Sequence, residues 1–169
     1  MSLVFLVALL AAQTAPATSN PPPCASANHH AFDFWSGEWE VRPYAGGPLI
    51  AHSRIELLYG GCAVRENWMP LKGTGGGSLS GYDAADGKWH QTWLDSSGTR
   101  AVFDGGMQGG AMVLTGAWKG SGPRGEDGLT RMTYTSEPGG AVRQKGDFSA
   151  DGGKTWVPTF DFLYTRAKP

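Results

Sequence analysis

Short breaks that contain glycine or proline divide the chain beyond residue 34 into ten short runs, and this spacing constrains the fold more than any other feature. Glycine supplies the positive φ that tight hairpins require. The breaks are too short for the crossover that joins parallel strands, so consecutive runs are expected to pair antiparallel. The predicted strands are Phe34–Arg42, Ile50–Tyr59, Cys62–Met69, Ser78–Tyr82, Lys88–Asp95, Thr99–Phe103, Ala111–Trp118, Leu129–Thr135, Val142–Ser149 and Thr155–Thr165.

A meander of ten strands has two edges to protect, and closure into a barrel removes both. The absence of any long apolar pattern of period 3.6, together with 26 glycines, favours an all-β fold. The sequence therefore predicts a single antiparallel meander β-barrel, with a β-sandwich as the alternative. The net charge of −1 gives no electrostatic reason to expect nucleic acid or an anionic membrane as a partner.

The first residues have the pattern of a secretory leader. The apolar run Leu3–Ala12 is far shorter than the ~20 residues that span a bilayer, so a membrane-anchoring helix is the less favoured alternative. Small residues follow, and Ala15-Pro16-Ala17 matches an A-x-A cleavage site. The expected organisation is a signal peptide (1–17), a flexible linker (18–28) and a barrel domain (29–169). This predicts an exported protein, periplasmic or secreted, with no membrane association after leader cleavage.

The chain has two cysteines, Cys24 and Cys62. In an exported protein such a pair predicts a disulfide, which here would tie the N-terminal segment to the barrel. The alternative is two unpaired, buried thiols.

Alternation along several strands places aromatic rings and isolated polar groups on one face. A lumen that holds a small apolar ligand has this composition. A barrel filled by its own side chains would show the same pattern, so both interpretations stay open. The candidate lining residues are Glu66, Trp68, Trp89, Gln91, Trp93 and Phe160.

Motifs across nearly all of the expected mature chain resemble a family of exported bacterial proteins that carry a domain of unknown function. The opening residues 32–41 (FDFWSGEWEV) match its FDFW-x-G-x-W-x-V motif. The later motifs follow in the same order, in residues 53–56 (SRIE), 61–68 (GCAVRENW), 82–93 (YDAADGKWHQTW) and 151–156 (DGGKTW).

That family in turn resembles the calycins, which include the lipocalins, fatty-acid-binding proteins and nitrobindins. Their first strand carries Gly-x-Trp, here Gly37-Glu38-Trp39, and the resemblance implies that Arg166 packs across the Trp39 ring. The iron-ligating histidine of the nitrobindins lies near the C-terminus, whereas no histidine follows His90 here. We therefore expect no haem and no other cofactor.

No group of residues predicts catalysis. The four histidines, at positions 29, 30, 52 and 90, have no metal-site spacing, and there is no G-x-S-x-G elbow. Glu66 and Asp95 are the best inward-facing carboxylates, with nothing to set their separation. Residues 149–156 match an Asp-box, in which Asp151 caps the turn and Trp156 packs over it. The leading hypothesis is a ligand-binding barrel; a filled structural barrel and an enzyme of unknown reaction are the alternatives, and the oligomeric state stays open.

Overall fold

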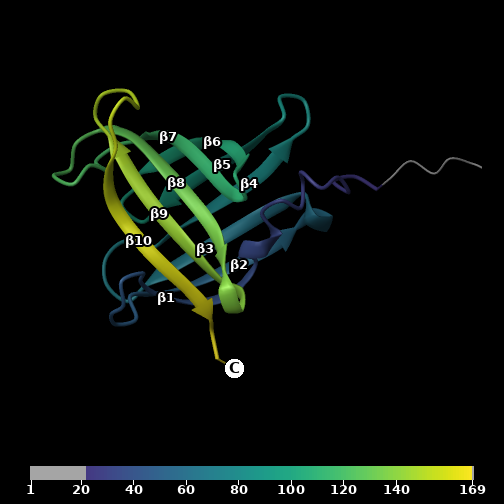
Figure 1. Ribbon diagram of the computed structural model, residues 1–169, viewed down its shortest axis with the longest axis horizontal. Coiled ribbons are helices and arrows are strands. Elements are labelled where there is room, and N and C mark those ends of the chain that lie inside the picture. The colour runs from purple at the N-terminus through teal and green to yellow at the C-terminus, as the bar shows by residue number, and fades with distance from the viewer. Residues whose placement is uncertain (1–21, 169) are drawn as a thin grey trace, which may run out of the picture.

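The computed structural model describes residues 22–168 and contains a closed barrel of ten antiparallel strands (Figure 1). Three short 3-10 helices accompany them: η1 (Asp33–Trp35), η2 (Tyr59–Gly61) and η3 (Pro138–Gly140). The predicted signal peptide lies outside the described residues. The strands are β1 (Gly37–Pro43), β2 (Ala51–Leu58), β3 (Ala63–Pro70), β4 (Gly76–Asp83), β5 (Lys88–Asp95), β6 (Arg100–Gln108), β7 (Ala111–Trp118), β8 (Gly128–Glu137), β9 (Ala141–Ser149) and β10 (Val157–Arg166).

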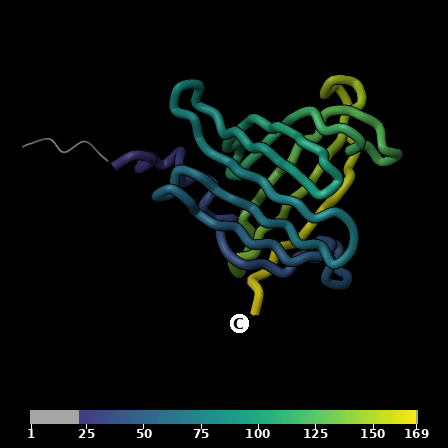
Figure 2. The backbone as a smooth tube through the Cα atoms, turned by 180° about the vertical axis from the view of Figure 1, so that it is seen from behind, coloured from purple at the N-terminus to yellow at the C-terminus, as the bar shows by residue number. Residues whose placement is uncertain are grey.

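Each strand pairs with its neighbours in the sequence, and β1 closes the ring against β10. Trp39 marks this seam, because it lies opposite Ser53 of β2 on one side and Arg166 of β10 on the other. Figures 1 and 2 show the strands following one another around the barrel from opposite sides. The predicted meander barrel is confirmed, and the sandwich alternative is wrong.

Two glycine pairs that were expected to break strands lie inside them. β6 runs through Gly105-Gly106, and β4 begins at Gly76 instead of Ser78. A Cβ at Gly105 would lie 1.9 Å from the Val113 carbonyl oxygen, and one at Gly77 would lie 2.6 Å from that of Glu66. Glycine at these positions therefore allows the backbones of neighbouring strands to approach closely. The turn after β6 is made by Gly109 and Gly110, which have positive φ.

The predicted first strand also begins too early. Phe34 and Trp35 belong to η1, and β1 starts at Gly37. At the other end of the chain, Trp156 precedes β10 instead of forming part of it. Among the remaining strands, apart from β4 and β6, which are described above, β5 and β7 have the predicted bounds and the others differ by a residue or two.

The segment before β1 closes one end of the barrel. Phe32 and Trp35 are fully buried and stack at 4.9 Å between ring centroids, and Phe32 lies equally far from the Tyr134 ring inside the barrel. The predicted disulfide is confirmed, since Cys24 bonds to Cys62 between η2 and β3. Residues 22–36, which we call the N-terminal plug, are therefore held to the barrel by a covalent bond and by buried aromatic rings.

A cation–π contact lies beside the seam. The Arg166 guanidinium carbon is 3.9 Å from the Trp39 ring centroid, and Nη1 donates to the Ser36 carbonyl oxygen at 2.6 Å. A Cβ at Gly37 would lie 1.7 Å from that nitrogen, so only glycine leaves room for the guanidinium. Gly37 also has a φ of +136°, which glycine adopts without strain.

The Asp-box turn precedes β10. Asp151 Oδ1 accepts from the backbone N–H groups of Lys154 (3.0 Å) and Thr155 (2.9 Å), and Trp156 Nε1 donates to the Gly153 carbonyl oxygen at 2.9 Å. The hydrogen bonds from Thr155 lower the pKa of Asp151 to about 2. Arg131 covers the Trp156 ring at 4.2 Å. These contacts stabilise a hairpin.

Across residues 22–168, no helix has the length and apolar character needed to cross a membrane.

Candidate ligand-binding cavity

A cavity of about 300 Å3 lies in the barrel lumen beyond the N-terminal plug. Strand β5 runs past both the plugged end of the lumen and the cavity. Its Trp89 contacts the plug, whereas Trp93 and Asp95 further along the strand line the cavity. The lining residues are Glu66, Trp68, Thr74, Gln91, Trp93, Asp95, Phe103, Trp118, Met132, Tyr134, Gln144, Phe160, Phe162 and Tyr164.

Aromatic rings form much of the wall. On one side Trp68 stacks on Phe162 at 5.8 Å, and Phe162 stacks on Phe160 at 5.1 Å. On another side Trp93 lies 6.2 Å from Trp118. Rings that pack on one another in this way present a large apolar surface at little cost in side-chain freedom.

Glu66 is the buried acidic residue of the cavity. Its side chain comes from the middle of β3, and the residue is only 6% exposed. Ser78 Oγ donates to Oε2 at 3.1 Å, and Ser53 Oγ approaches Oε1 at 3.5 Å. Burial raises the pKa of Glu66 to about 7, and the two serine hydroxyls oppose that rise only in part.

Neutral polar groups surround this carboxyl group. Tyr164 donates to Gln144 Oε1 at 2.6 Å, and Gln144 Nε2 donates to the Tyr134 hydroxyl at 3.0 Å. Burial and the nearby charge of Glu66 raise the pKa of both tyrosines well above its usual value. Gln91 Nε2 donates to Ser80 at 3.0 Å. Each of these interior polar side chains therefore has a hydrogen-bond partner, as most buried polar groups do.

A second carboxylate, Asp95, lies at the far end of β5. Trp93 Nε1 donates to its Oδ2 at 3.1 Å, and the Ser97 hydroxyl donates to Oδ1 at 2.6 Å. The bond from Ser97 is the main reason why the pKa of Asp95 is lowered. Asp95 is therefore ionised at neutral pH, and no lysine, arginine or histidine is among the residues that line the cavity.

Five of the six residues predicted to line the lumen do so: Glu66, Trp68, Gln91, Trp93 and Phe160. Trp89 is not among the residues that line the cavity, because this ring lies edge-on to Phe32 at 5.7 Å and its Nε1 donates to the Asn28 carbonyl oxygen at 3.1 Å. Trp89 points into the lumen as alternation requires, but the N-terminal plug occupies that end.

Other lining residues were missed. They come from β6 to β10 and from the loop before β4, and the main ones are Phe103, Trp118, Met132, Tyr134, Gln144, Phe162 and Tyr164. In β8 the large residues Met132 and Tyr134 alternate in the sequence with the polar Arg131 and Thr133, and this pattern could have identified both as inner-face residues.

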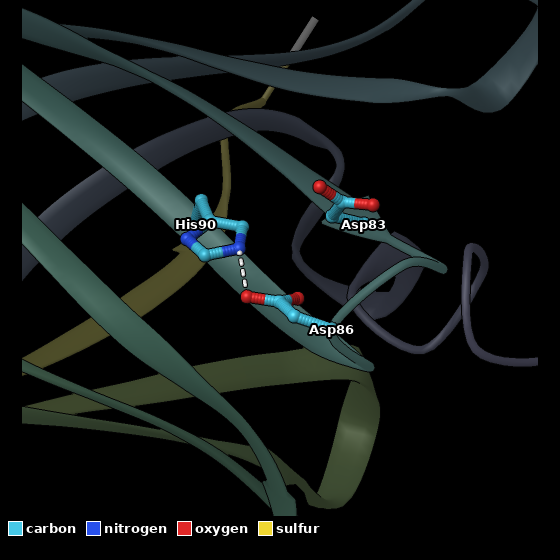
Figure 3. A group of neighbouring side chains, drawn as sticks. All are labelled: Asp83, Asp86 and His90. Carbon is cyan, nitrogen blue, oxygen red and sulfur yellow. Dashed lines mark hydrogen bonds and ion pairs between the residues drawn. The ribbon is translucent and has the colours of Figure 1, made fainter.

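A group of charged side chains lies outside the lumen at the β4–β5 turn. Asp83, Asp86 and His90 place one ligand atom each within 4.8 Å of the others (Figure 3). His90 Nε2 is 3.0 Å from Asp86 and Nδ1 is 2.6 Å from Asp104, and the bond to Asp104 is the main cause of a raised pKa at His90. Since a protonated imidazole has no lone pair for a metal ion, these contacts favour ion pairing.

The chain was compared with models of known protein families and with curated proteins, and neither comparison found a match.

Proposed function

We propose that this protein is an exported, calycin-like barrel that binds a small, mostly apolar ligand in its lumen. The observation that carries the proposal is the cavity of about 300 Å3, walled by aromatic rings and supplied with a few polar groups. Ligand pockets commonly measure about 300–1,000 Å3 and have this composition.

The cavity favours ligand binding over a barrel filled by its own side chains. Trp68, Trp93 and Trp118 are only partly buried and line the cavity, whereas Trp35 and Trp39 are packed at the plugged end. The protein therefore has a closed end and a lined cavity beyond it.

Export and the calycin relationship have separate support. The Cys24–Cys62 disulfide fits an oxidising compartment, and the leader pattern in residues 1–17 fits secretion. The contact of Arg166 with Trp39 beside Gly37 fits the Gly-x-Trp motif of the calycins. The intact mass of the exported protein tests leader cleavage near Ala12 or Ala17.

Tryptophan fluorescence tests binding, because three tryptophans line the cavity. The exported protein is titrated with fatty acids, retinoids and hydrophobic dyes, and the purified protein is extracted for mass spectrometry. Thr74→Trp adds bulk to a loop residue that lines the cavity, and Leu71→Trp adds the same side chain to the exposed neighbouring loop position. We expect saturable binding that Thr74→Trp weakens at least about tenfold and Leu71→Trp leaves unchanged. The absence of saturable binding and of any co-purified small molecule would refute the proposal.

A further inference from the structure

The charges of the cavity have one sign. Glu66 and Asp95 are acidic, and the other lining residues are neutral. A site for a fatty acid or another anion needs a cationic or strongly donating partner for the ligand, and an anion placed beside Glu66 would meet a like charge instead.

We propose that the ligand is an organic amine whose protonated nitrogen binds at Glu66 while its apolar body lies among the aromatic rings. This inference rests on the proposed function and names the class of ligand for the same cavity.

The hydrogen bonding of Glu66 supports a cationic partner. Its carboxylate accepts from Ser53 and Ser78 alone among residues 22–168, and no basic side chain in that part of the chain forms an ion pair with it. A carboxylate offers about four acceptor positions, so about two remain for a ligand. An ammonium group supplies three donors and the positive charge that a buried carboxylate otherwise lacks.

Aromatic faces lie beside the same position. Glu66 and Trp68 are two residues apart on β3, so their side chains point to the same face of the sheet. Trp68 also lies 6.4 Å from Tyr164 and stacks on Phe162. The faces of such rings attract cations, and the attraction strengthens where water is excluded.

Glu66 is also the group in this cavity that titrates near neutral pH. The groups around it are Ser53 on β2, Ser78 on β4, Tyr134 on β8 and Tyr164 on β10, with neutral glutamines on β5 and β9. Both tyrosines titrate far above neutrality, and Asp95 titrates below its usual range. An ammonium group favours the ionised carboxylate, so amine binding below pH 7 is coupled to proton release from Glu66.

The test uses three ligands that share one ring system: 2-(1-naphthyl)ethylamine, 2-(1-naphthyl)ethanol and 1-naphthylacetate. Binding to the exported protein is measured by calorimetry at pH 8, and the amine is expected to bind about tenfold more tightly than the alcohol, with the acid weakest. Between pH 8 and pH 5 the amine affinity is expected to fall by up to about a hundredfold, while that of the alcohol stays constant.

Glu66→Gln keeps the shape of the side chain and removes its charge. We expect this variant to lose both the preference for the amine over the alcohol and the pH dependence of amine binding. Glu38→Gln, an identical change on an exposed side chain of β1, is the matched control and should retain both. The pH series on the unaltered protein gives the same answer if Glu66→Gln does not fold.

The outcomes separate the two proposals. Equal binding of amine and alcohol, tighter binding of the acid, or an amine affinity that does not change with pH overturns the amine assignment and leaves lumen binding standing. Failure of all three naphthyl compounds, with saturable binding of fatty acids or dyes in the fluorescence titration, also overturns the amine assignment alone. Failure of every ligand in both experiments overturns the proposed function as well.

Discussion

Replacing Glu66 by glutamine is expected to stabilise the folded protein at pH 8 and to leave its stability nearly unchanged at pH 4. In the folded barrel the Glu66 carboxyl group is buried, and its pKa is raised from 4.5 to about 7. In the unfolded chain the same group is solvated and loses its proton near its ordinary pKa. Glutamine has nearly the same size, can hydrogen-bond to both serines and does not ionise.

The magnitude follows from proton linkage. Between pH 4.5 and pH 7 the folded state keeps a proton on Glu66 that the unfolded state has released. The free energy of unfolding therefore falls as the pH rises through this window and is constant with respect to Glu66 above it. The difference between the two pKa values corresponds to about 3 kcal/mol in the free energy of unfolding. The unaltered protein loses this amount as the pH rises through the window, and the glutamine variant does not.

Urea unfolding at several pH values measures this difference directly. Effects of the other ionisable groups, such as Asp151 and His90, occur in both proteins and cancel in the comparison. We expect the variant to gain about 3 kcal/mol relative to the unaltered protein between pH 4 and pH 8, and Glu38→Gln to show no such trend. If the free energies of unfolding of Glu66→Gln and of the unaltered protein differ by the same amount at every pH, the claim that Glu66 is buried without a cationic partner is refuted.

Two further predictions concern the ends of the barrel. Trp39→Ala should lower the free energy of unfolding by about 3–5 kcal/mol, because it removes a buried ring at the β1–β10 seam together with its contact to Arg166. If urea unfolding shows nearly the same free energy for this variant, the Trp39 ring and its contact with Arg166 do not stabilise the barrel. Replacing Cys24 and Cys62 together by serine should cost about 3–4 kcal/mol, since their bond closes a loop across 38 positions of sequence. Non-reducing mass analysis should find two hydrogens fewer in the unaltered protein, and labelling of free thiols would contradict the disulfide.

Glycine positions explain where strand prediction succeeded and failed. A glycine at a turn and a glycine beneath a neighbouring backbone look alike in a sequence, so the sequence pattern predicts a strand break at Gly105. In the structure Gly105 lies against the Val113 carbonyl oxygen on β7, whereas Gly109 and Gly110 have positive φ and make the turn. This difference depends on the partner strand, which local patterns do not specify.

The lining of the lumen shows a similar division. Alternation correctly placed Glu66 and Trp93 on the inner face, because successive side chains in a strand point to opposite sides. It also placed Trp89 there, but alternation contains no information on how far along the lumen the N-terminal plug extends. Phe32 packs against Trp89, and the cavity begins only beyond that contact.

Local patterns in the chain were therefore sufficient for the number of strands, their antiparallel order, the inner face of several of them and the pairing of two cysteines. The depth of the cavity and the state of Glu66 depend on residues far apart in the sequence. Ser53 and Ser78 hydrogen-bond to this carboxyl group from β2 and β4, and Tyr134 and Tyr164 lie near it on β8 and β10. Burial among these groups raises its pKa, and that environment exists only once the barrel has closed.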